Sequence, residues 1–282
     1  MPVSLRKNNY GKQRVRLVRV VRESERHQLR DITVGIRFEG DFEAAHVSGD
    51  NSRILPTDTM KNTVYAMAGQ QEPGALEDFG SRLARHFLTE NPHLWRVTID
   101  LVEDGWARLP LGGPDGHPHA FMAIGGEQQT ATVVASRDQR TTLSGLSGLT
   151  VLKTKDSGFV GFIKDEFTTL PEVTDRIFKT VIDAEWTCIP AEVPYGALRQ
   201  GVRRALLEVF ARHDSLSVQQ TLHAMAEAAL ERHADLREIT LRLPNRHCIP
   251  FDLRPFGMEN RNEVFVATDE PHGQIEATVG RA

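Results

Sequence analysis

Cysteine is scarce in this chain of 282 residues, which has only Cys188 and Cys248. The two are far apart and form no CxxC pair, so the sequence has none of the cysteine spacing that structural zinc sites use. Such a sparse pair, in a chain without a signal peptide, is typical of reduced intracellular thiols. We therefore expect no disulfide.

Long apolar runs are also missing. No stretch approaches the roughly 20 residues that a membrane-spanning helix needs, and the N-terminal residues contain no apolar core of a signal peptide. The last four residues, Val-Gly-Arg-Ala, differ from the Ser-Lys-Leu signal for peroxisomes. We expect a soluble, cytoplasmic protein.

No strong charge of one sign is present, because 34 Lys and Arg residues face 38 Asp and Glu residues and give a net charge of -4. This balance argues against a nucleic-acid-binding or polybasic membrane-binding surface. The GxSxG, GxxxxGK[ST], HExxH and GxGxxG motifs are absent, which excludes several large enzyme classes. His117 and His119 could bind a metal, but histidines in a Pro/Gly-rich turn are more often solvated, and we expect no metal site.

Hydrophobic periodicity in the first half predicts a hairpin, two helices and two more strands. Alternation at residues 15–17 and 32–38 predicts the hairpin, and apolar residues at helical spacing predict helices from Thr57 and over 76–87, stopped by Asn91-Pro92. Strands are expected again around 95–101, with Trp95, Val97, Ile99 and Leu101 on one face, and at 130–135.

The second half repeats this order. Strands are predicted at 141–153, 159–163 and 178–187. Two helices follow, at 198–209 and from Val218, where Ser217 and Gln220 have the spacing of a capping box. Further strands are expected at 236–243, 263–267 and 275–279.

Two successive ββααββ units indicate a tandem duplication, with residues 1–137 as the first repeat and 138–282 as the second. The fold class is α+β, with helices covering one face of each antiparallel sheet. Sheets with helices on only one face usually close into a barrel or pack against another subunit, so we expect an oligomer.

The most informative motif is DNSRILPTDTMKNTVYAMA, at residues 50–68. Pro56 before Thr57 and Asp58 is an ordinary helix start. The free N–H groups at such a start also favour an anionic ligand.

This motif resembles the signature of urate oxidases, and further blocks agree in the same order along the chain. They are Asn9-Tyr10-Gly11-Lys12, the run LSGLTVLKTKDSGFVGFIKDEFTTLPEVTDRIF at residues 146–178, SVQQT at 217–221, LPNRH at 243–247, and residues 273–281. The resemblance thus covers about residues 9 to 281. It implies the tunnelling fold, in which four chains stack into a barrel with active sites at subunit interfaces.

The resemblance also implies roles for individual residues. Lys12 and Thr57 match a catalytic dyad, in which a desolvated lysine acts as a base and the hydroxyl relays the proton. His247 matches a histidine that shares in proton transfer, and Asn245 matches the asparagine at the oxygen or water site. The residues that match substrate contacts are Thr57, Asp58, Phe159, Arg176, Val218, Gln219, Asn245 and Ile275. Arg246 stands where lysine is common, outside the expected contacts.

Each match has an alternative structural explanation. Without the resemblance, Lys12 would be a solvated charge, Arg176 a surface ion pair, Gln219 a helix cap and Phe159 a core strand residue. An isolated His247 would more often be structural.

The implied reaction is oxidation of urate by O2 and water to 5-hydroxyisourate and hydrogen peroxide, without a cofactor, in purine degradation. Two other functions stay open at this point. A zinc-dependent pterin enzyme of the same superfamily would need a compact histidine triad, and none is evident. A purine-binding protein without catalysis would need only the residues that contact the purine, whereas this chain also has Lys12, Thr57, Asn245 and His247.

Overall fold

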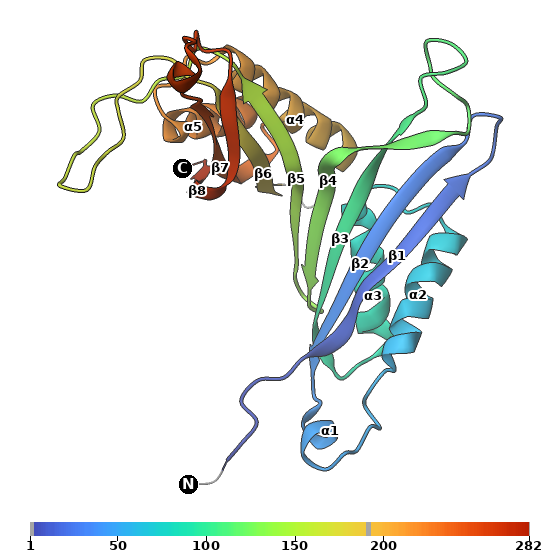
Figure 1. Ribbon diagram of the computed structural model, residues 1–282. Coiled ribbons are helices and arrows are strands. Elements are labelled where there is room, and N and C mark those ends of the chain that lie inside the picture. Colours follow the sequence, from blue (N-terminus) through green and yellow to red (C-terminus); the bar gives the residue numbers. More distant parts are fainter. Residues whose placement is uncertain (1–2, 190–192, 282) are drawn as a thin grey trace. The chain divides into compact units, whose positions relative to one another are not determined.

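The computed structural model describes residues 3–189 and 193–281, which form two compact units, Met1–Gly145 and Leu146–Ala282 (Figure 1). Within these residues, no helix is long and apolar enough to span a membrane. The strands of each unit are antiparallel and follow one another in sequence order. Antiparallel sheets with separate helices confirm the predicted α+β class.

The first unit has the order strand, strand, helices, strand, strand. Its elements are β1 (Tyr10–Val21), β2 (Gln28–Gly40), α1 (Glu43–Val47), α2 (Thr57–Gln70), α3 (Leu76–Glu90), β3 (Leu94–Arg108) and β4 (Phe121–Ala135). Helix α2 packs on β1, and α3 packs on β3 and β4. The predicted hairpin, both helices and the stop at Asn91 are confirmed, whereas the short helix α1 was not predicted.

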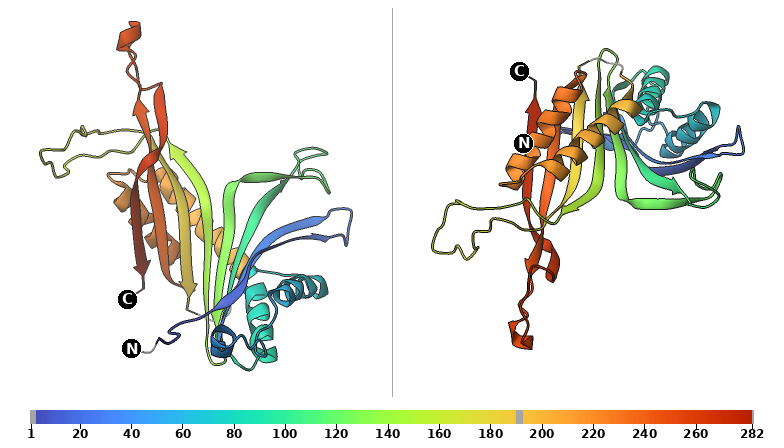
Figure 2. Two further views of the ribbon diagram at one scale, coloured as in Figure 1. Left: turned by 60° about the horizontal axis from the view of Figure 1, so that its bottom comes forward. Right: turned by 90° about the horizontal axis from the view of Figure 1, so that it is seen from above.

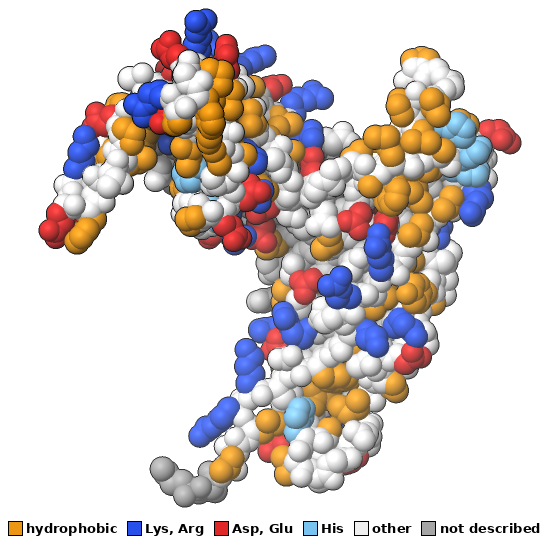
Figure 3. All heavy atoms as spheres, in the orientation of Figure 1, with side chains coloured by type: hydrophobic (Ala, Val, Ile, Leu, Met, Phe, Trp, Pro, Cys, Tyr) orange, Lys and Arg blue, Asp and Glu red, His pale blue; other side chains and the backbone are white. Residues whose placement is uncertain are grey.

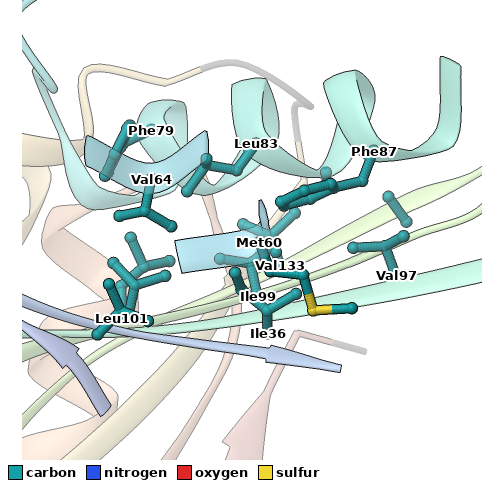
Figure 4. Close-up of a cluster of buried hydrophobic side chains, with 14 of the residues drawn as sticks. Ile36, Met60, Val64, Phe79, Leu83, Phe87, Val97, Ile99, Leu101 and Val133 are labelled. Carbon is teal, nitrogen blue, oxygen red and sulfur yellow. The ribbon is translucent and has the colours of Figure 1, made fainter. Parts of the chain in front are cut away.

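The core of the first unit lies between these helices and one face of the sheet (Figure 4). Side chains that alternate along the strands meet side chains at helical spacing, and each fully buried one stabilises the fold by roughly 1.5–3 kcal/mol. Residues shown in this cluster include Ile36, Met60, Val64, Phe79, Leu83, Phe87, Val97, Ile99, Leu101 and Val133.

Trp95 departs from the predicted face. Its side chain is 54% exposed, whereas Val97 and Ile99 are fully buried. The pairing of β2 with β3 shifts register between Glu39 and Gly40, next to the start of β3. The alternation therefore holds only from Val97 onward, and the prediction for Trp95 was wrong.

The second unit has the order strand, strand, helix, helix, strand, strand. Its elements are β5 (Arg140–Lys153), which begins in the last residues of the first unit, β6 (Phe178–Cys188), α4 (Tyr195–Arg212), α5 (Val218–Arg232), β7 (Leu236–Pro250), the 3-10 helix η1 (Arg254–Phe256) and β8 (Phe265–Gly280). Helices α4 and α5 pack together, and α5 covers β7 and β8. The β7–β8 hairpin extends beyond both helices and ends near η1 (Figure 2).

Two strand predictions in this unit were wrong. Residues 159–163 form no strand, because Phe159 makes only an isolated bridge to Val173 within the long loop between β5 and β6. Residues 265–267 and 275–279 of the two predicted strands belong to one strand, β8, and residues 263 and 264 precede it. Pro271 interrupts the alternating pattern between the two ranges. Because β8 is the last strand in the sheet order, it is an edge strand, and an edge strand tolerates a proline, which has no N–H donor.

Candidate functional site

A β-bulge places Lys12 in the first unit. Lys12 pairs with Ile36, whereas Val15 pairs with Val34, so β1 has one extra residue between them. Arg14, within the bulge, has a left-handed backbone with φ of 58°. Because paired residues share a sheet face, Lys12 lies on the helix-covered face together with Val15, despite their odd spacing.

Tyr10 links the start of β1 by hydrogen bonds to the segment that precedes α2. Its hydroxyl accepts a hydrogen bond from the Leu55 N–H at 2.9 Å and lies 3.3 Å from the Leu55 carbonyl oxygen, to which it donates. Leu55 is two residues before Thr57, the first residue of α2. The hydroxyl therefore holds the segments of Lys12 and Thr57 side by side, a role that the sequence analysis missed although Tyr10 belongs to the matched block.

The start of α2 has no side-chain cap, because Pro56 precedes it. Thr57 is half-buried, and Asp58 is exposed and accepts a hydrogen bond from Asn62 at 2.9 Å. The pKa of the Asp58 carboxyl is lowered mainly by its hydrogen bond and ion pair with Lys61, and also by the charge of Lys12. Lys12 is thus close enough to the start of α2 to act on it electrostatically.

Phe159 and Arg176 lie together in the second unit. The Arg176 guanidinium carbon is 5.5 Å from the Phe159 ring centroid, and the ring stacks on Phe162 with centroids 4.8 Å apart. Backbone hydrogen bonds of 2.7 and 3.1 Å join Phe159 to Val173, three residues before Arg176. Burial lowers the pKa of the Arg176 guanidinium from its ordinary value, because the charged group lies in a partly desolvated place.

Val218 and Gln219 begin α5. Val218 is buried and Gln219 is exposed. Ser217 caps this helix by accepting a hydrogen bond from the Gln220 N–H at 3.1 Å, and the Gln220 side chain accepts one from the Leu216 N–H at 3.0 Å. The expected pair of Ser217 and Gln220 therefore caps the helix, and the Gln219 side chain is not needed for the cap.

Asn245, His247 and Ile275 lie along β7 and β8, close to the start of β6. Asn245 pairs with Thr180 on β6 and with Gly273 on β8. Ile275 pairs with Leu243, two residues before Asn245. The β7–β8 register shifts between Asn245 and His247. Since β6 begins two residues after Arg176, this part of β7 lies near the Arg176 segment.

The matched polar side chains other than Asp58 share one property. In the part of the chain that the structure describes, none of them makes a side-chain hydrogen bond or an ion pair. They are Lys12, Thr57, Arg176, Gln219, Asn245 and His247. Polar groups near the interior normally find partners, so a set left without them is suited to a polar ligand.

The residues are divided between the two units. Lys12, Thr57 and Asp58 belong to the first unit, and the others belong to the second. The second unit brings Phe159, Arg176 and the start of α5 together through backbone contacts. Each unit therefore provides one part of the predicted site.

Histidine side chains gather at one end of the first unit, near the β3–β4 connection (Figure 3). The His117 and His119 ring centroids are 4.5 Å apart, and those of His27 and His119 are 5.7 Å apart. Among the described residues, no group of three or more His, Cys, Asp or Glu side chains has an arrangement that could hold a metal ion.

The family model described as Uricase matches residues 8–134 and 142–276. The chain is 43% identical to a uricase of Arthrobacter globiformis over 287 residues, covering 99% of this chain and 90% of that protein. It is 36% identical to a uricase of Dictyostelium discoideum, covering 98% and 96%. The chain belongs to the uricase family. Its fold agrees with the crystal structure of the Arthrobacter globiformis uricase, with a TM-score of 0.94, 42% identity and coverage of 100% and 96%.

Proposed function

We propose that this member of the uricase family oxidises urate with O2 and water to 5-hydroxyisourate and hydrogen peroxide, using its own side chains and no cofactor. The activity is that of an oxidoreductase, a urate oxidase. The observation that supports the detailed assignment is the set of polar side chains left without partners, which are the residue types that a polar purine and a proton transfer require.

In the second unit, Phe159 stacks on the purine ring and Arg176 binds a carbonyl and a ring nitrogen through its planar fork of donors. The Gln219 amide binds the opposite edge of the purine with one donor and one acceptor. Val218 and Ile275 line the pocket. The partly desolvated guanidinium supports this assignment, because an anionic ligand would supply the partner that it lacks.

In the first unit, Lys12 takes a proton from urate and the Thr57 hydroxyl relays it, while the Asp58 backbone contributes a contact at the start of α2. The resulting dianion is electron-rich enough to transfer an electron directly to O2. A peroxide forms at C5 and water displaces hydrogen peroxide from it, so urate, O2 and water give 5-hydroxyisourate and hydrogen peroxide. Asn245 holds the oxygen or water site, and His247 shares in the proton transfer.

A complete site needs both a first and a second unit, and we propose that it forms between chains of a homotetramer built as a barrel from the paired ββααββ repeats. Large apolar side chains exposed on β4, β7 and β8 support self-association, and Figure 3 shows apolar side chains among the charged ones on the surface. The exposed residues on these strands are Met122, Ile124, Ile249 and Val266.

The reaction is tested with purified, metal-stripped protein by following urate absorbance, oxygen and hydrogen peroxide together. Loss of urate and oxygen in parallel with the appearance of peroxide is the expected result. Activity that returns only after a metal is added would overturn the cofactor-free mechanism.

The shared site is tested by mixing Lys12→Met and Arg176→Met chains during refolding or coexpression. If each site combines two chains, random mixing restores about a quarter of the sites, because some interfaces then receive both intact parts. No recovery, although mixed oligomers form, would show that each site belongs to a single chain.

A further inference from the structure

Two buried hydroxyl groups lie between the end of α4 and the first turn of α5. The Ser215 Oγ is 2.5 Å from the Thr221 Oγ1, and the two side chains are 1% and 0% exposed. His213, which follows the last residue of α4, places its Nδ1 3.2 Å from the same Thr221 oxygen. The three side chains therefore form a continuous hydrogen-bonded network.

This network includes the Ser217 carbonyl oxygen, which lies 3.2 Å from the Ser215 Oγ and 3.3 Å from the Thr221 Oγ1, but it does not cap the N–H groups of α5. Ser217 and Gln220 already form the cap, and the Thr221 N–H bonds to the Ser217 carbonyl as the first helical bond. Burying a hydroxyl costs free energy unless its hydrogen bonds are made. An apolar residue of the same size at position 221 would avoid this desolvation cost. The retained hydroxyl pair therefore points to a positioning role beyond the helix start.

Ser215 also connects the network to the loop that carries Phe159. Its N–H donates to the Asp156 carbonyl at 2.9 Å, and its carbonyl accepts from the Gly158 N–H at 2.8 Å, in a short parallel bridge with Ser157. The residue after Gly158 is Phe159. The loop extends away from the helices and strands of the second unit in Figure 1, and this bridge joins its Phe159 segment to the residues before α5.

The same segment is joined to Arg176. The Ser157 N–H donates to the Asp175 carboxylate at 3.2 Å, next to Arg176 in sequence. Gly158 fits against this strand of backbone, since a Cβ there would lie 3.0 Å from the Thr174 carbonyl oxygen. Three chain segments, which carry Phe159, Arg176 and Gln219, thus meet around Ser157 and Ser215.

Lys153, at the end of β5, connects this strand to the end of α4. Its Nζ donates to the His213 carbonyl at 2.5 Å and lies 5.8 Å from the Phe210 ring centroid. A cation at the C-terminal end of α4 is favoured by the helix dipole. Lys153 therefore fixes the end of α4 from which His213 and Ser215 extend.

We propose that the hydroxyl pair of Ser215 and Thr221, supported by His213, is a positioning network that holds Phe159, Arg176 and Gln219 in the arrangement that binds urate. The proposal rests on the substrate site given above as the proposed function. These residues touch one another and the backbone of the binding segments, so they act through the residues that contact the purine.

The test compares Thr221→Val, which removes the hydroxyl at nearly constant volume, with Thr221→Ser, which keeps it. Urate binding is measured by calorimetry without oxygen, and KM and kcat are measured with oxygen. Thr278→Val is the control for loss of a hydroxyl outside the network, because it breaks a solvent-exposed hydroxyl pair of the same unit, Thr240 with Thr278 at 2.7 Å.

Thr221→Val is expected to weaken urate binding and raise the urate KM roughly tenfold, the scale of one lost hydrogen bond. Thr221→Ser and Thr278→Val should bind urate within about twofold of the unmodified chain. Unchanged urate affinity in a folded Thr221→Val variant would overturn the proposal, as would equal weakening by Thr221→Val and Thr221→Ser, which would indicate volume rather than the hydroxyl.

Gln219→Ala, measured in the same series, separates this proposal from the assignment of the substrate site. If Gln219→Ala binds urate normally, the substrate site itself is wrong. If Gln219→Ala weakens binding and Thr221→Val does not, only the positioning network fails.

Discussion

Replacing Arg176 with methionine should separate ligand binding from stability. The side chain is half-buried over the Phe159 ring, and burial lowers the pKa of its guanidinium. Methionine removes a cation–π contact that stabilises the folded state by about 0.5–1 kcal/mol. It also removes a partly desolvated charge, whose burial destabilises the folded state. The two effects oppose each other, so the free energy of unfolding should change by less than about 1 kcal/mol.

Urate binding should respond much more strongly to the same change. A bidentate, charge-assisted contact to urate is worth about 2–4 kcal/mol, because hydrogen bonds to charged groups contribute about 1.5–3 kcal/mol each and the two bonds of one pair are not fully additive. Since every 1.4 kcal/mol is a factor of ten, the dissociation constant should rise by roughly 30-fold to 1000-fold.

Arg281→Met is the matched control for Arg176→Met. Arg281 donates hydrogen bonds to the Leu236 carbonyl at 2.8 Å and the His233 carbonyl at 3.1 Å, which join the end of the chain to α5 and β7. Its loss should lower the free energy of unfolding by about 1–2 kcal/mol and leave urate affinity unchanged. Calorimetry without oxygen and denaturant titration measure both quantities. A strongly destabilised Arg176→Met protein that still binds urate well would refute this reasoning.

Three further changes test other parts of the structure. Lys12→Met and Thr57→Ala should each lower kcat by at least about 100-fold while urate still binds, and full turnover in either variant would rule out the dyad. Phe79→Ala should lower the free energy of unfolding by about 3–5 kcal/mol in a denaturant titration, because this side chain is fully buried, whereas the exposed Trp95→Ala should cost less than about 1 kcal/mol. Burial, and secondarily the charge of Lys153, lowers the pKa of His213 below 6.5, so the unfolded chain binds a proton first as the pH falls. The free energy of unfolding should therefore decrease below about pH 6.5, and His213→Gln should show a smaller decrease if this titration is responsible.

Much of the fold was predictable because the periodicity is regular where one face of an element is buried. Residues 32–38 and 76–87 are examples, and both became core elements. The prediction for Trp95 failed because a register shift changes the face on which its side chain lies. The strand predicted at Phe159 failed because tertiary contacts place this residue in a loop with only an isolated bridge. No local pattern in a single sequence reports a register shift.

The candidate site was named by resemblance, and the structure shows how its segments are held. Tyr10 and Ser215 were not singled out as candidates, because their roles depend on contacts with Leu55 and Gly158 that are distant in sequence. Composition and periodicity alone lead only to a duplicated α+β protein. They contain no information about which polar side chains stay without partners.

The bulge in β1 makes the face on which Lys12 lies depend on how one extra residue of the strand is accommodated. Deleting Arg14 would restore a regular strand without removing Val15 or any other apolar residue of the core. Lys12 would then stay opposite Ile36 and keep its face of the sheet, because Lys12 and Val15 would be two residues apart in a regular strand. Straightening the strand at its full length would instead pair Lys12 with Arg37 and turn the lysine to the opposite face, so a change that removes the bulge without shortening the chain is the one expected to inactivate the enzyme.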